Sequence, residues 1–263
     1  MLAGSLFFFL IGLCIGSFLN VVVFRTHSEM PLVGRSRCMV CEIPLVWYDM
    51  IPVFSFMALR GRCRSCRTSI SWQYPVVEFM TGLLFMIAYL RYAGGYVLPA
   101  TATFDTLPIF MVRDLLFSVF LIIVFVYDLR YVLILDRFTV PAMIVALLIN
   151  VWLGMSPVDL LAGGTIIGGF FMAQYLLSRG TWVGGGDVRM GALMGLMLGL
   201  RDGLVALFIA YMLGAIIGIG LLLAGKVTPR SQVPFGTFLT LGTYIALFFG
   251  EEIVQWYLGL FMR

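Results

Sequence analysis

The sequence predicts an all-α polytopic membrane protein with about eight transmembrane helices and one small polar loop domain. Three observations predict this fold class. Apolar residues make up 62% of the 263 residues, charged residues only 11%, and the mean hydropathy is +1.05, values far from those of water-soluble domains. Apolar runs recur at the length of roughly 20 residues that a helix needs to cross a bilayer. Basic residues gather in every second segment between these runs, as they do in cytoplasmic loops.

Each predicted span is an apolar run bounded by charged or turn residues. The first lacks a basic segment before it and a small-residue cleavage site, so we expect a retained helix and not a cleaved signal peptide. The sixth covers only about two thirds of a bilayer at the helical rise. Most spans end before or begin after a charged residue, such as Arg25, Asp128 or Lys226. In chain order, the spans are 2–24, 76–94, 109–127, 138–154, 158–178, 187–200, 203–224 and 233–250.

The basic residues also predict the orientation, because short loops rich in Arg and Lys stay in the cytoplasm. Alternate loops hold 13 of the 17 basic residues, so these loops face the cytoplasm and both termini face outward. The net charge of +4 is then a topology signal, and no nucleic-acid partner is needed to explain it. The 13 residues are Arg25, Arg35, Arg37, Arg60, Arg62, Arg64, Arg67, Arg130, Arg137, Arg179, Arg189, Lys226 and Arg230.

Four of the five cysteines lie in the polar loop, as the two CxxC pairs Cys38/Cys41 and Cys63/Cys66. Two such pairs can supply four thiolates to one tetrahedral Zn²⁺, and a closed Cys₄ site of this kind is structural. Two disulfides or four unrelated thiols are the alternatives, and a reducing cytoplasm disfavours the disulfides. The sequence therefore predicts a first helix at 1–24, a zinc-binding cytoplasmic loop domain at 25–75 and a helical core at 76–263.

Carboxylates near the membrane are informative because a charge at the bilayer centre costs roughly 2.5–3.5 kcal/mol on insertion scales. Four of the 13 acidic residues fall at cytoplasmic membrane boundaries: Glu78, Asp128, Asp136 and Asp187. We expect Glu78 to be solvated at the interface. We expect the other nine to be hydrated, since they lie in the polar loop or in or beside segments predicted to face outward: Glu29, Glu42, Asp49, Asp105, Asp114, Asp159, Asp202, Glu251 and Glu252.

Asp128 ends the third span and Asp187 opens the sixth, so the topology puts both near the same cytoplasmic depth. Glycines 184–186 let another chain approach Asp187 closely, and Gly191 and Gly195 form a GxxxG face for a neighbouring helix. Two adjacent carboxyl groups cannot both ionise, so such a pair can activate water and protonate a departing amine. The alternative is two unrelated boundary residues, one capping the short span and the other hydrated or paired with a nearby arginine.

Several motifs along nearly the whole chain resemble the type IV prepilin peptidases, which are leader peptidases and N-methyltransferases of the GxGD intramembrane aspartic protease class. They are "GSFLNVVVFR" at 16–25, the two CxxC pairs, "IPVFSFMALRGRCRSC" at 51–66, "SISWQYPVVEFMTGLLF" at 69–85, "YDLRYVLILDRFTVP" at 127–141, "GGGD" at 184–187 and "VPFGTFLTLG" at 233–242. The resemblance implies that Asp128 and Asp187 are the catalytic pair.

The same resemblance implies the substrates and the cofactor. They are type IV prepilins or pseudopilins, whose basic leader would be cut at the cytoplasmic boundary of a bacterial inner membrane, with S-adenosylmethionine as donor for methylation of the new N-terminus. Two other classes of function stay open. An ion-coupled transporter would place its carboxylates nearer the bilayer midplane, and a zinc-organised scaffold of a pilus or secretion machine would need no chemistry.

Overall fold

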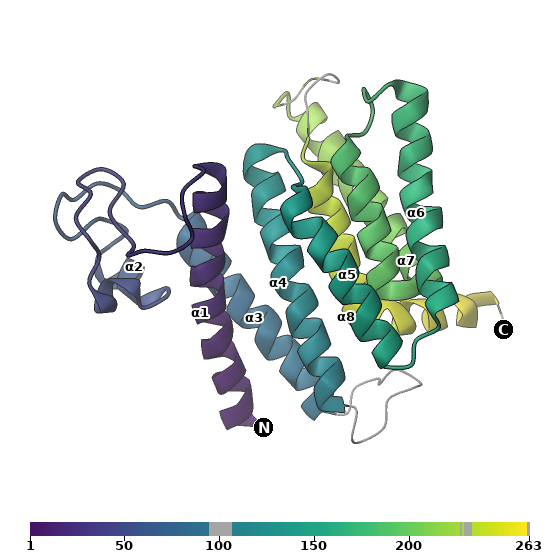
Figure 1. Cartoon of the computed structure of the whole chain (residues 1–263), viewed down its shortest axis with the longest axis horizontal. Coiled ribbons are helices and arrows are strands. Elements are labelled where there is room, and N and C mark those ends of the chain that lie inside the picture. The colour runs from purple at the N-terminus through teal and green to yellow at the C-terminus, as the bar shows by residue number, and fades with distance from the viewer. Residues whose placement is uncertain (95–106, 227, 229–232, 262–263) are drawn as a thin grey trace. The chain divides into compact units, whose positions relative to one another are not determined.

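Helices dominate this chain because a segment in lipid must satisfy its backbone hydrogen bonds internally. The computed structural model describes residues 1–94, 107–226, 228 and 233–261, and within these ranges the regular structure is helical apart from two isolated β-bridges (Figure 1). Six of the helices are long and apolar enough to cross a membrane. The predicted all-α polytopic fold is confirmed. Asp105 and Arg230, which the sequence assigned to loops, lie outside the described residues.

The chain divides into two units, residues Met1–Tyr96 and Val97–Arg263. In the first, two long helices pack through small residues: a methyl group added to Gly12 would lie 2.7 Å from the Cα of Gly82. The Asn20 side-chain amide donates a hydrogen bond of 3.1 Å to the carbonyl of Tyr74. The elements of this unit are α1 (Leu2–His27), the 3₁₀ turn η1 (Trp47–Met50), α2 (Phe54–Ala58) and α3 (Gln73–Ala93).

The second unit is a helical bundle in which each predicted span has a counterpart. Its helices are α4 (Leu107–Tyr131), α5 (Asp136–Trp152), α6 (Pro157–Ser178), α7 (Gly185–Leu223) and α8 (Phe235–Phe261). α4 extends past its predicted end, so Asp128 lies in the last turn of the helix and not after it. α5 is the shortest of the five, at 17 residues.

Helix α7 contains both the sixth and the seventh predicted spans, because the chain reverses within it at Gly199. This residue has φ 79° and ψ −176°, a conformation open to glycine and costly for other residues. A methyl group on Gly203 would lie 3.6 Å from the Cα of Gly195, whereas these residues would be about 12 Å apart along an unbroken helix. We call residues 185–198 the short arm and residues 200–223 the long arm.

The short arm packs against α6 through glycines on both helices. A methyl group on Gly163 would lie 2.7 Å from the carbonyl carbon of Gly199 and 2.9 Å from the carbonyl oxygen of Gly195. A methyl group on Gly191 would meet the Phe171 ring. The predicted GxxxG face of Gly191 and Gly195 is confirmed as a helix-packing surface.

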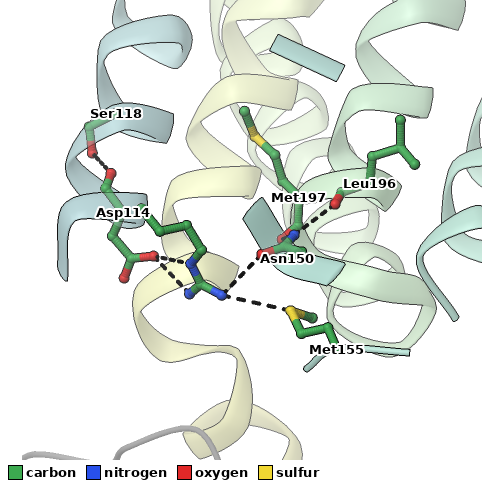
Figure 2. Close-up of polar contacts among 7 residues, drawn as sticks. Asp114, Ser118, Asn150, Met155, Leu196 and Met197 are labelled. Atoms are coloured by element: carbon green, nitrogen blue, oxygen red, sulfur yellow. Dashed lines mark hydrogen bonds and ion pairs between the residues drawn. The ribbon is translucent and has the colours of Figure 1, made fainter. Parts of the chain in front are cut away.

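Asp114 corrects one prediction from the sequence. The sequence predicts that this residue is hydrated, but its side chain is fully buried within the bundle and forms an ion pair of 2.8 Å with Arg113 (Figure 2). A charge pair is tolerated in such an environment only when each charge has its partner. The position of Asp114 near the end of a predicted span therefore does not reveal which way its side chain points.

Candidate active site and cysteine cluster

Asp128 lies in the last turn of α4 and is only 4% exposed. Its Oδ2 accepts two hydrogen bonds from Thr237, one from the backbone N–H at 2.7 Å and one from the hydroxyl at 3.1 Å. Thr237 lies in the first turn of α8, where the backbone N–H groups have no partner within the helix. The N-terminus of α8 therefore holds the Asp128 carboxyl group.

Asp187 lies in the first turn of α7 and is 9% exposed. Its Oδ2 accepts the backbone N–H of Gly184 at 2.9 Å, while its own N–H donates to the Gly184 carbonyl at 3.1 Å. This reciprocal contact is the one that an acidic residue makes in the first turn of a helix. The glycines before Asp187 thus begin the short arm and fix its carboxyl group.

Ile134, in the connection between α4 and α5, contacts residues beside both aspartates. A methyl group on Gly186 would lie 2.8 Å from the Ile134 Cβ. A methyl group on Gly236 would lie 2.6 Å from the Ile134 Cδ1 and 2.9 Å from the Asp128 Oδ2. The two carboxyl groups are also near enough to interact electrostatically. The structure therefore gathers Asp128 and Asp187, which are distant in sequence, at one buried place.

The two other boundary carboxylates have different surroundings. Asp136 begins α5, is exposed and pairs with Arg189. Glu78 is 7% exposed, and its Oε2 accepts the backbone N–H of Val53 at 2.7 Å, so the prediction that it is solvated is wrong. Val53 has φ 62°, which is unfavourable for a β-branched residue, and the bond to Glu78 holds that turn against α3.

Aromatic side chains that the sequence did not single out lie beside the aspartates. The ring of Tyr211, on the long arm, lies 5.1 Å from that of Phe235 and 6.3 Å from that of Phe171. Gln174 donates to the Tyr211 hydroxyl at 3.1 Å, and Tyr211 is near enough to Asp187 to interact with its charge. Only the "VPFGT" motif offered a sequence signal for this region, and it did not identify Thr237 as the partner of Asp128.

The structure brings the four loop cysteines together. The sulfur atoms of Cys38, Cys41, Cys63 and Cys66 all lie within 4.8 Å of one another, and those of Cys38 and Cys66 are 3.7 Å apart. Four sulfurs at about 2.3 Å from a tetrahedral zinc would be about 3.8 Å apart. The cluster therefore has the donor set and the approximate size of a Cys₄ metal site.

The two cysteine pairs lie in turns of matching geometry. In the first, Cys38 N–H donates to the Ile43 carbonyl at 3.1 Å, and Glu42 adopts φ 57°. In the second, Cys63 N–H donates to the Thr68 carbonyl at 2.8 Å, and Arg67 adopts φ 61°. Backbone N–H groups of Cys41 and Val40 donate to the Cys38 sulfur and lower the pKa of this thiol to about 6.

The chain is similar to known families over most of its length. The model of the bacterial peptidase A24 N-terminal domain matches residues 10–92, and that of the type IV leader peptidase family matches residues 115–219. A prepilin leader peptidase/N-methyltransferase from Aeromonas salmonicida is 31% identical over 282 residues, which cover 95% of this chain and 92% of that protein. The proteins of the same description from Myxococcus xanthus and Bacillus subtilis are 36% and 30% identical, over 87% and 95% of this chain and 66% and 96% of their own lengths. No solved structure matches.

Proposed function

Because the chain belongs to the type IV leader peptidase family, we propose that it cleaves the leader from type IV prepilins or pseudopilins, with Asp128 and Asp187 as the catalytic pair, and N-methylates the product. One observation carries the assignment of the pair. Both carboxyl groups are buried in one place, and each is held through Oδ2 by a backbone N–H group. Carboxylates are rarely kept in such a membrane site without a functional role.

The arrangement suits hydrolysis of a peptide bond by water. One carboxylate takes a proton from water while the water oxygen attacks the scissile carbonyl carbon, and the other carboxyl group gives its proton to the carbonyl oxygen. When the tetrahedral adduct collapses, the C–N bond breaks and the amine leaves with the proton that the first carboxyl group took from water. A hydroxyl of the adduct returns its proton to the other carboxylate. Oδ2 of each aspartate is already engaged, by Thr237 in one case and by Gly184 in the other, which fixes the orientation of both carboxyl groups.

The family and the six apolar helices put the protein in a bacterial inner membrane as a multi-pass protein. We propose the orientation that the basic residues predict, with both termini outward. The aspartates then lie at the cytoplasmic boundary, where a substrate arriving laterally from the lipid bilayer would present its basic leader.

We further propose that the cysteine cluster binds one structural Zn²⁺. All four ligands come from the chain, which leaves no open position for catalysis. When bound, the metal would hold together the two turns of a loop that has little apolar core of its own, so its binding energy would contribute directly to folding of this loop.

The methyl donor implied by the family is S-adenosylmethionine, which carries a carboxylate and a positively charged sulfonium. A cavity of about 300 Å³ in the loop domain is lined by Leu59, Arg60, Arg62 and Arg67. The guanidinium groups suit a carboxylate but repel a sulfonium. This cavity therefore fits only one end of the donor, and we derive no step of methyl transfer from it.

To test the proposal, the purified protein in lipid is incubated with a prepilin and S-adenosylmethionine, and the mass of the product is measured by mass spectrometry. We expect the mass of the leader to be lost and one methyl group to be gained. An intact prepilin after prolonged incubation would exclude the peptidase and favour the scaffold. Ion flux through protein-containing vesicles, dependent on Asp128, would instead favour the transporter.

Thr237→Val is expected to lower kcat for leader removal roughly tenfold. The variant keeps the shape of the side chain and the backbone N–H bond but removes the hydroxyl bond to Asp128, and a hydrogen bond to a charged group contributes about 1.5–3 kcal/mol. Thr237→Ser should retain most of the activity. Thr243→Val is the matched control, because that buried hydroxyl donates only to the Leu239 carbonyl in its own helix. Equal activity of Thr237→Val and the parent would show that the hydroxyl has no part in catalysis.

A further inference from the structure

The reversal of α7 leaves backbone carbonyl groups at the end of the short arm without helical partners. Carbonyls in the last turn of a helix need N–H groups four residues further on, and the turn at Gly199 removes them. In a membrane such groups must be satisfied by protein. The side-chain amide of Asn150, on α5, donates to the carbonyls of Leu196 at 2.9 Å and Met197 at 3.0 Å (Figure 2).

Arg113, on α4, fixes the orientation of this amide. The guanidinium group donates to the Asn150 Oδ1 at 3.3 Å and to the Asp114 carboxylate at 2.9 Å. Because arginine can only donate, the oxygen of Asn150 must face it and the NH₂ group must face α7. All three side chains are buried, so the amide has no water with which to exchange these bonds.

The far side of the reversal is held by Asp159, on α6. Its carboxylate accepts the N–H of Leu200 at 3.4 Å, at the start of the long arm. Asn150 and Asp159 thus satisfy the last carbonyls of one arm and the first N–H group of the other. The reversal is fixed by side chains from two other helices and not by the turn alone.

The glycine-lined contact between α6 and the short arm restrains the arm along its axis only where a side chain lies on a glycine, as Phe171 does on Gly191. Glycines bring the two backbones close, but they provide few side-chain ridges to resist sliding. Hydrogen bonds from Asn150 to two particular carbonyls supply a further restraint, because a shift of one residue along the axis, about 1.5 Å, breaks both.

We propose that Arg113 and Asn150 are positioning residues that set the depth of Asp187 relative to Asp128. α4 carries Arg113 near one end and Asp128 at the other, about 22 Å away, while the short arm carries Met197 near one end and Asp187 at the other, about 15 Å away. Asn150 joins the two helices at the ends remote from the carboxyl groups. This inference rests on the proposed catalytic role of the two aspartates.

Asn150→Asp tests the proposal. The variant keeps the size of the side chain and an acceptor for Arg113, but it points an oxygen instead of an NH₂ group at the Leu196 and Met197 carbonyls. We expect amide hydrogen exchange in residues 190–203 to accelerate at least about tenfold, kcat for leader removal to fall about 10- to 100-fold, and KM to stay within about twofold. Asn150→Gln, which retains a donor one methylene further out, should recover part of kcat.

Asn20→Asp is the matched control, because it removes a buried amide-to-carbonyl bond of the same kind from the first unit. Its exchange should rise around Tyr74 and stay unchanged in residues 190–203. Unchanged exchange in residues 190–203 of Asn150→Asp, or faster exchange with unchanged kcat, would overturn the proposal. If Asn150→Asp does not fold, the same two measurements on Asn150→Leu, which has nearly the same size and no donor, decide, with parental values again overturning the proposal.

The exchange result does not depend on which residues are catalytic. Full activity of Asp187→Asn would refute the proposed dyad while leaving the measured restraint on the short arm intact. If Asp128→Asn and Asp187→Asn are inactive but Asn150→Asp leaves hydrogen exchange in residues 190–203 unchanged, only the positioning role is refuted. The two failures are therefore distinguishable.

Discussion

Asp128→Asn and Asp187→Asn are each expected to abolish leader removal, with a loss on the order of 10³-fold or more in kcat. The amide has the shape of the carboxyl group and can still accept the N–H of Thr237 or Gly184. It cannot hold or transfer the proton on which general acid and base catalysis by the pair depends, a contribution of about 10²- to 10⁴-fold for a single group. Cleavage is measured by mass spectrometry on purified protein in lipid, and unchanged hydrogen exchange outside the site confirms the fold.

Asp136→Asn is the control for this pair of variants. The sequence predicts the same membrane boundary for Asp136, but this residue is exposed and paired with Arg189. An exposed ion pair contributes at most about 1 kcal/mol, so the effect on cleavage should be mild. Near-normal cleavage by Asp128→Asn or Asp187→Asn would refute the dyad, and an inactive Asp136→Asn would transfer the first catalytic role to α5.

Cys41→Ser and Cys63→Ser are expected to remove zinc and most of the methyl transfer, while proteolysis loses much less. Each variant takes away one of four thiolates, and a structural Cys₄ site contributes on the order of 10 kcal/mol to local folding. The disorder should be confined to residues 38–66, because the aspartates lie on α4 and α7 in the other unit. The expected residual effect on proteolysis is poorer capture of the leader, seen as a higher KM.

Cys14→Ser is the matched control, because Cys14 lies on α1 and is not one of the four clustered cysteines. It should bind about one zinc per chain and retain both activities. Metal analysis comes first and requires about one zinc in the parent and little in the two cluster variants. A parent without metal, or a cluster variant that methylates at the parental rate, would mean that the loop is not a zinc-dependent transferase element.

The helices could be predicted because apolar length alone determines what crosses a bilayer. The break in α7 was also accessible, since charged and small residues around Arg201 divide two apolar runs. The topology predicts that Asp128 and Asp187 lie at a similar depth in the membrane. It does not predict that their side chains lie close together. Their partners could not be predicted either, because a threonine at the start of α8 and an isoleucine between α4 and α5 acquire their roles only when distant helices meet.

Two errors have a common cause. The positions of Asp114 and Glu78 near the ends of spans predict hydrated side chains, but both side chains point into protein, toward Arg113 and the backbone of Val53 respectively. Sequence position gives the depth of a residue in the membrane. It does not give the direction of the side chain around the helix axis, and direction decides whether a carboxylate at that depth is hydrated or buried.

The shortness of the arm that carries Asp187 has a consequence for biogenesis. Residues 185–198 reach about 21 Å, less than the roughly 30 Å of a hydrocarbon core, so this segment is a poor substrate for independent insertion during synthesis. Its partners on α5 and α6 are made first: Asn150 on α5, Asp159 on α6 and the α6 glycines precede it in the chain. The order of translation therefore supplies a receiving surface before the short arm emerges, and the segment with Asp187 joins helices that are already in the bilayer.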